Sequence, residues 1–347
     1  TTLENPSAIV SEAVEELKGR LFYIQSQAGK YFFTNHANLN HLLLVRMENI
    51  HDPEIKSQEE RLLRENVKTN KLKAYIWRTE SADIPDTPDL KLIVLPENNP
   101  NAIKTILEEK GGSPRVHRNT MFFLVPMLSE RAAFGSLLRR FLAYQVLLSD
   151  ITLNLTADQT SEIKSNLKRL EGDLAEGLRR LYRQIYLPAR TGVKESDLGV
   201  PTSGYSGFID QEVYERLRSD GEILEKIAPL VIREKFLKDR DWVSTVQLYQ
   251  SSLKTPGEAR ATSQMAWDTG IAEGVRLGLF GLGEIEGEHS TCRYFKTECS
   301  VAFADNEVLI KAEICQAQLA AQQAQVNLVP GDRPTRPVNE PDSTTFV

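Results

Sequence analysis

Residues 118–188 read RNTMFFLVPMLSERAAFGSLLRRFLAYQVLLSDITLNLTADQTSEIKSNLKRLEGDLAEGLRRLYRQIYLP. The apolar run Met121–Val125 predicts a short buried strand. Apolar side chains then recur every three or four residues over about Ser129–Ser149, which predicts a helix with one core-facing stripe. The same spacing continues over about Ala157–Leu187 in a narrower seam of leucines and isoleucines. Together the two helices predict a long antiparallel hairpin over 129–188.

Local signals mark where the second helix begins and ends. Thr156 and Gln159 have the spacing of a capping box, and Pro188 is a residue that stops a helix. At about 1.5 Å per residue, a helix of this length reaches roughly 45 Å. The hairpin is therefore expected to be long enough to link separate modules.

The composition is that of a globular protein with more than one domain. The chain has 347 residues, 41% of them hydrophobic and 26% charged, which predicts two or three domains with cores of their own. The net charge of −6 argues against a surface that coats DNA generally, and no apolar run approaches the roughly 20 residues of a membrane span. No secretory signal begins the chain, and three irregularly spaced cysteines indicate a reducing cytoplasm. Because the chain starts at Thr1 and enters a helix at once, we expect it to be a piece of a longer protein.

Helical and strand-like patterns on either side of the hairpin suggest further modules. The N-terminal residues predict a helix capped by Asn5, two aromatic strands around Gly29, and a second helix, an order that suggests part of a winged helix. The segment Trp242–Val246 opens a second unit of this kind. The expected fold class is α/β plus mainly α, divided into a winged-helix-like N-terminal module (1–50), a small α/β sheet domain with the long antiparallel helical hairpin (51–190), a linker (191–207), a helical, winged-helix-like C-terminal domain (208–315) and a flexible tail (316–347).

The α/β domain is expected to contain a small, partly parallel sheet. Strand-like runs at Ala74–Arg78 and Leu90–Leu95, and a helix over about Asn101–Lys110, precede the strand at Met121. The order strand, strand, helix, strand, helix is typical of such a sheet. The charged segment His51–Leu72 predicts a solvated linker helix.

One basic cluster lies on a loop and is a candidate for contact with phosphate or a nucleic-acid backbone. Arg115, His117 and Arg118 follow the Gly111–Gly112 turn at the expected edge of the sheet. The other basic clusters fall on predicted helices, where solvated faces and pairs four residues apart account for them.

The loop before the second strand contains the letters of a magnesium-dependent nuclease site. In such a site two acids hold the metal and a lysine supports the attacking water, roles that Asp86, Asp89 and Lys91 would take. Here the three residues lie close together on one loop, so turn formation by the acids is the simpler interpretation.

The cysteines do not form a zinc motif. Cys292, Cys299 and Cys315, with His289, lack the spacing of two to four residues that a zinc finger or ribbon requires. We therefore expect no metal site and interpret the cysteines as buried or incidental.

The order of segments resembles a known family. KYFFTNHANLNHLLLVRMENI, IPDTPDLKLIVL, RNTMFFLVP and the hairpin ending in YLP follow one another as in the C-terminal half of a prokaryotic family of large P-loop AAA+-type ATPases. These proteins carry a domain of unknown function, and some occur in anti-phage defence islands. The resemblance covers roughly Leu21–Pro188 well and Phe208–Ile310 loosely. It implies an ATPase core that precedes Thr1 and binds ATP and magnesium, and it transfers no catalytic residue to this chain.

The leading interpretation is a non-catalytic regulatory and partner-binding portion of a cytoplasmic AAA+-like ATPase that defends against foreign DNA. Its expected partners are the other domains of the parent ATPase, with DNA, proteins of a defence system and further copies of the chain as additional candidates. The first alternative is a small nuclease-like α/β domain using Asp86, Asp89 and Lys91. The second is a stand-alone winged-helix regulator that binds DNA.

Overall fold

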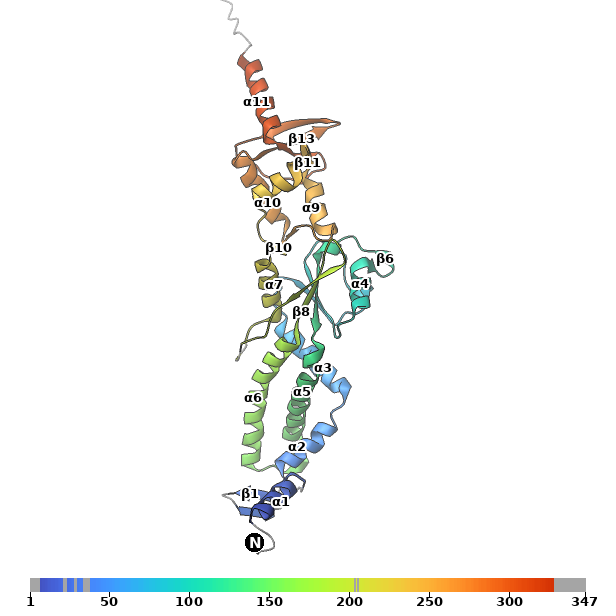
Figure 1. Ribbon diagram of the computed structural model, residues 1–347, viewed down its shortest axis with the longest axis vertical. Coiled ribbons are helices and arrows are strands. Elements are labelled where there is room, and N and C mark those ends of the chain that lie inside the picture. The colour runs from blue at the N-terminus through green and yellow to red at the C-terminus, as the bar shows by residue number, and fades with distance from the viewer. Residues whose placement is uncertain are drawn as a thin grey trace, which may run out of the picture. The chain divides into compact units, whose positions relative to one another are not determined.

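The computed structural model describes residues 7–20, 24–27, 30–33, 38–202, 204 and 206–327. The chain forms a mixed α/β structure with two compact units (Figure 1). Unit 1 contains Thr1–Leu224 and Ser251–Thr262, and unit 2 contains Glu225–Gln250 and Ser263–Val347. Each unit is thus built from two separate stretches of sequence. Within the described ranges, every helix is too short or too polar to cross a lipid bilayer.

The centre of unit 1 is a five-stranded sheet in the order β3 (Lys73–Ile76), β4 (Lys91–Val94), β7 (Met121–Pro126), β8 (Tyr182–Pro188), β9 (Val193–Asp197). The first three strands are parallel, and the last two are antiparallel to their neighbours. The expectation of a partly parallel sheet is therefore confirmed.

Both faces of this sheet are buried. Alternate residues of β4 and β7, such as Ile93 and Phe123, pack with helix α4 (Pro100–Glu108) on one face. The residues between them, such as Leu92 and Phe122, belong to the larger core that includes the helical hairpin. Because successive side chains of a strand point to opposite faces, the continuous apolar runs supply both cores at once.

The predicted hairpin consists of α5 (Leu128–Ser149) and α6 (Ala157–Leu181), which lie side by side (Figure 1). Thr156 and Gln159 form the expected capping box. Gly177 lets α6 approach α5 closely, since a Cβ atom there would lie 3.1 Å from Phe134.

The expected C-terminal end of the second helix is wrong. Helix α6 ends at Leu181, and the residues up to Pro188 form β8, which pairs with β7 and β9. The leucine and isoleucine spacing continued past the helix because Ile185 and Leu187 are also buried as alternate residues of a strand.

The N-terminal part contains α1 (Ser7–Arg20), the hairpin of β1 (Ile24–Gln27) with β2 (Lys30–Phe33), α2 (Leu39–Glu48) and α3 (Asp52–Asn66). The expected cap at Asn5 and the turn glycine Gly29 lie outside the described residues. Helix α2 packs on α5, and α3 contacts both helices of the hairpin. The expected solvated linker helix is therefore partly a core helix, because α3 buries Ile55, Gln58, Glu59 and Leu63.

Short elements complete unit 1. They are η1 (Ser81–Asp83), β5 (Glu109–Lys110), β6 (Ser113–Pro114), η2 (Arg118–Thr120), η3 (Ile151–Leu153), α7 (Ile209–Ser219) and the parallel pair β10 (Ile223–Leu224) and β12 (Arg260–Ala261).

The expected linker and tail need correction. Strand β9 lies inside the expected linker 191–207, where its backbone pairs with β8 although most of its side chains are exposed. In the expected tail 316–347, helix α11 (Ala312–Asn327) continues to Asn327, and residues 328–347 lie outside the described part of the chain. Contacts of Cys315 and Gln318 with β14 (His289–Tyr294) hold this helix in place.

Unit 2 combines helices with an antiparallel sheet. Its helices are α8 (Pro229–Ile232) with the π-turn η4 (Arg233–Leu237), most of α9 (Thr245–Lys254), α10 (Gln264–Arg276) and α11. The sheet has the order β11 (Trp242–Ser244), β15 (Glu307–Lys311), β13 (Phe280–Glu286), β14. The last returning strand, β15, lies between the first strand and β13.

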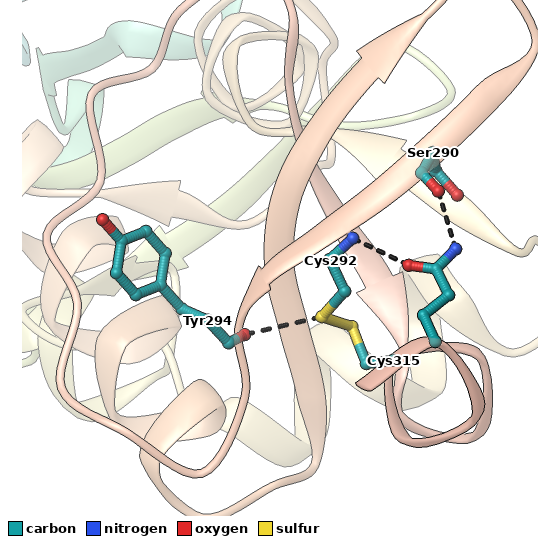
Figure 2. The surroundings of a disulfide bond; sticks show 5 residues. Ser290, Cys292, Tyr294 and Cys315 are labelled. Carbon is teal, nitrogen blue, oxygen red and sulfur yellow. Dashed lines mark hydrogen bonds between the residues drawn. A yellow bond between two sulfur atoms is a disulfide. The ribbon is translucent and has the colours of Figure 1, made fainter. Parts of the chain in front are cut away.

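A disulfide between Cys292 of β14 and Cys315 of α11 closes this unit (Figure 2). The Gln318 side chain adds two hydrogen bonds between the same elements, accepting from the Cys292 N–H at 2.8 Å and donating to the Ser290 carbonyl at 2.7 Å. Gly281 is required beside the bridge, since a Cβ there would lie 2.1 Å from the Cys315 sulfur. The two cysteines are buried as expected, but they are paired, which a reducing cytoplasm did not suggest.

Removal of the disulfide is expected to destabilise unit 2. Because the bridged cysteines are 23 residues apart, Cys315→Ser should lower the free energy of unfolding by about 2–4 kcal/mol. Denaturant unfolding without reductant measures this change. Cys299→Ser, which alters the unpaired thiol, is the matched control and should unfold like the wild type. Equal midpoints for the two variants would contradict the bridge.

Candidate functional site

The structure brings together the loops that carry the predicted phosphate-binding and nuclease residues. The Asp86 carboxylate accepts hydrogen bonds from the backbone N–H of Val116 at 2.7 Å and of His117 at 2.9 Å, and it contacts His117 Nδ1 at 3.0 Å. Burial opposes ionisation of Asp86, but these hydrogen bonds outweigh it and lower its pKa. Asp86 therefore anchors the loop that contains His117.

Arg115 is buried and holds the same loops together by hydrogen bonds. Its guanidinium donates to five backbone carbonyls at 2.8–3.3 Å, those of Ser81, Ile84, Pro85, Ile106 and Glu109. A guanidinium saturated in this way cannot grip a phosphate. The expected phosphate contact by Arg115 does not fit the structure, whereas Arg118 of the same cluster is exposed.

The three expected nuclease residues also have separate structural partners. Lys91 is 1% exposed, and its ammonium donates to the Thr87 carbonyl at 2.5 Å, the Asp89 carbonyl at 2.8 Å and the Thr120 hydroxyl at 3.3 Å. Burial lowers the pKa of Lys91 to about 8. The Asp89 carboxylate instead pairs with Lys73 at 2.8 Å. In the described part of the chain, no three histidine, cysteine or acidic side chains gather as metal ligands.

Asn119, next to this cluster, fastens the segment Ser251–Thr262 to the sheet domain. Its fully buried amide donates to the carbonyls of Ser252 at 2.7 Å and Glu258 at 3.1 Å, and accepts from the Gly257 N–H at 3.1 Å. Its own backbone carbonyl accepts from Arg260 at 2.9 Å. Sequence reasoning did not predict this role, because every partner lies more than a hundred residues away.

Arg260 completes this fastening. Its guanidinium is buried and also donates to the Glu222 carboxylate at 2.8 Å and to the Pro188 carbonyl. One arginine therefore joins η2, β8 and the turn between α7 and β10 to the returning segment. Burial lowers the pKa of Arg260, and its pairing with Glu222 counteracts this effect.

A cavity of about 770 Å³ lies at the carboxyl ends of the parallel strands of unit 1, and we name it the edge pocket. Ligands of open α/β sheets commonly bind at this edge. The walls come from α3, the segments that follow β3, β4 and β7, the beginning of α5, and β8. They carry apolar rings and prolines beside charged groups, among them Trp77, Pro96, Tyr186, Lys56, Arg131 and Arg139.

A buried polar network supports the base of the edge pocket. Glu59, with a side chain only 2% exposed, accepts from Arg131 at 2.6 and 2.8 Å and from the Tyr182 hydroxyl at 2.6 Å. The Tyr182 hydroxyl in turn accepts from the Trp77 indole N–H at 3.2 Å. Burial and the Glu59 charge raise the pKa of Tyr182 well above its ordinary value, so its hydroxyl keeps its proton. This network fixes the positions of Arg131 and Trp77.

Trp77 lies in the left-handed backbone region with φ of +54°. A bulky side chain rarely adopts this conformation, which costs on the order of 1–3 kcal/mol, and such strain concentrates at functional sites. The backbone N–H of Trp77 donates a hydrogen bond to the Val94 carbonyl at 2.8 Å, which holds the residue in this conformation. The strained tryptophan and the open cavity that it lines together make the edge pocket our candidate functional site.

The sequence carried little signal for this site. Glu59 lies in a highly charged helix, and its burial depends on Arg131 and Tyr182, which are 72 and 123 residues away. An isolated Trp77 after a short strand has no periodicity to identify it.

The chain matches no family model, and no curated protein or solved structure is significantly similar to it.

The buried Lys91 makes stability depend on pH. In the folded chain its pKa falls from an ordinary 10.5 to about 8, so between these values the unfolded chain binds the additional proton. Wild-type stability should therefore increase from pH 8 to 10.5, by up to about 3 kcal/mol, relative to Lys91→Met. Paired denaturant titrations across this range measure the difference. A difference that does not change with pH would show that Lys91 keeps its proton.

Loss of the Asn119 amide should release the returning segment. Asn119→Ala removes two donated hydrogen bonds and one accepted bond at a fully buried position, and should lower the free energy of unfolding by about 2–4 kcal/mol. Asn101→Ala, at an exposed position, is the control. Limited proteolysis should cut between residues 251 and 262 faster in Asn119→Ala alone. Equal cutting of the two variants would rule out the fastening role.

Proposed function

We propose that this chain is a non-catalytic, partner-binding portion of an AAA+-like ATPase that acts in defence against foreign DNA. One observation carries the non-catalytic part of this proposal. The candidate catalytic or phosphate-binding side chains form hydrogen bonds that hold loops of the chain together. These side chains are Asp86, Lys91 and Arg115. The resemblance of residues 21–188 to the ATPase family supplies the rest, including ATP and magnesium bound by residues outside this chain.

The order of elements in unit 2 supports a winged-helix-like module. A helix (α8 with η4), a strand (β11), two helices (α9 and α10) and two strands (β13 and β15) occur in this order along the chain, with β12 between the two helices and β14 between the two strands. Strand β15 pairs with both β11 and β13. Strand β14 then lies in the position of an extended wing, and α11 follows the sheet. The N-terminal helix and strand pairs are proposed as a second module of this kind.

The exposed side chains at the two ends of α10 favour a protein partner over DNA. In helix-turn-helix proteins the second helix of the pair enters the major groove, and DNA affinity depends on basic side chains. Helix α10 instead exposes the apolar side chains of Met265 and, at its C-cap, Leu277. The charged residues of the helix include Asp268 and Glu273 beside a single arginine, Arg276. We therefore propose other domains of the parent ATPase, defence proteins or further copies of the chain as partners.

A DNA-binding assay over a salt series tests the proposed function. Fluorescence anisotropy with a duplex at 50–200 mM salt should show no tight binding near physiological salt, and magnesium should leave the DNA intact. Arg118→Ala should change any residual binding by less than about threefold, because one phosphate contact contributes little. Tight binding that decreases steeply with salt would instead support a DNA-binding regulator. Cleavage that Asp89→Ala abolishes, with an unchanged circular dichroism spectrum, would support the nuclease alternative.

A further inference from the structure

We propose that the edge pocket binds a mononucleotide, with its planar base against Trp77 and its phosphate near Lys56 and Arg139. This inference goes beyond partner binding and adds a small-molecule site to the sheet domain. The cavity volume of about 770 Å³ lies within the roughly 300–1,000 Å³ of typical small-molecule sites.

The charged side chains that line the pocket balance one another, three acidic against three basic (Asp52, Glu59, Glu97, Lys56, Arg131 and Arg139), and helix N-termini add positive partial charge. The first helical residues of three helices line it, namely Asp52 of α3, Pro100 of α4 and Leu128 of α5. Each helix N-terminus carries a partial positive charge of about one half. No side chain caps the N-terminus of α5, because the residue at that position is Met127.

Two cationic side chains on the walls are open to a ligand. Lys56 is exposed, and no ion pair involves it among the described residues. Arg139 contacts Asp52 at 3.0 Å, but this carboxylate is 79% exposed, so the pair is weak and a phosphate can replace it. Arg131 differs from both because the buried Glu59 already neutralises it. The pocket therefore has two cations available to a ligand at its rim, Lys56 and Arg139, whereas Arg131 at its base is held by Glu59.

The walls also suit a planar ring. Trp77 and Tyr186 line the cavity together with Pro96, Pro100 and Pro126. Trp77 is held both by its indole hydrogen bond to Tyr182 and by its backbone conformation, so its ring is fixed before a ligand arrives. Aromatic side chains held in this way stack on nucleic-acid bases of every sequence.

Gly135 leaves one wall of the edge pocket open. It lies in the middle of α5 and lines the pocket, and a Cβ atom there would meet nothing within 4 Å. Gly172 of α6 is equally open and lies outside the pocket, so the glycine itself does not mark a ligand site. Gly135 instead offers a position at which a larger side chain would project into the cavity.

The test combines calorimetry with intrinsic fluorescence on the full chain. The probes are AMP, GMP, CMP and UMP, with adenosine and inorganic phosphate as the two partial ligands. At least one mononucleotide should bind with a Kd below about 1 mM, and each partial ligand should bind at least tenfold more weakly. Binding should quench fluorescence in the wild type but not in Trp77→Phe, which keeps the other two tryptophans.

Matched variants locate the site. Gly135→Leu places a side chain in part of the cavity and should weaken nucleotide binding at least tenfold, whereas Gly172→Leu makes the same change at an open, mid-helix position of α6 outside the pocket and should not. Lys56→Gln should weaken mononucleotide binding about fivefold and leave adenosine binding unchanged. Unchanged thermal unfolding confirms that the variants fold. Failure of all four mononucleotides to bind below 1 mM, or equal binding by the Gly135 and Gly172 variants, would overturn the proposal.

Discussion

The pairing of β7 with β4 on one edge and with β8 on the other is the constraint on which unit 1 depends. The first pairing is parallel and the second antiparallel, so the chain leaves β7 and must return to the same end of the sheet before β8 begins. An out-and-back helical hairpin satisfies this requirement. Because β7 is buried on both faces, α4 and the hairpin must each cover one side. The edge pocket lies where these connections depart, which makes it a consequence of the topology.

Buried polar side chains fix the parts of unit 1 that lack regular structure. Arg115 binds carbonyls of two segments, 81–85 and 106–109, and Asn119 binds carbonyls of the segment 251–262, whose own Arg260 binds the Asn119 carbonyl. Each carbonyl would otherwise lose its water without gaining a partner. Asp86 and Lys91 belong to the same class of contact. Residue types typical of active sites thus hold backbone segments together here, a role that sequence patterns alone do not reveal.

Local periodicity predicted most of the helices and strands of the hairpin region. It did not predict features that depend on contacts between residues distant in the sequence. The strand at Met121, both hairpin helices and the Thr156 capping box are encoded within windows of about twenty residues. The end of α6 was missed because Ile185 fits a helical step and a buried strand equally well. Strand β9 was missed because its exposed polar residues resemble a linker, while the pairing that defines it lies in the backbone. The edge pocket depends on Glu59, Arg131 and Tyr182, which meet only in three dimensions.

The assignment of Ser251–Thr262 to unit 1 has a consequence for synthesis on the ribosome. Unit 1 lacks the guanidinium of Arg260 until that residue has emerged, and by then the first stretch of unit 2, Glu225–Gln250, is already outside. Domains encoded by one continuous stretch commonly fold in order from the N-terminus. Here neither unit is complete before part of the other has been synthesised, so the two units cannot fold strictly one after the other.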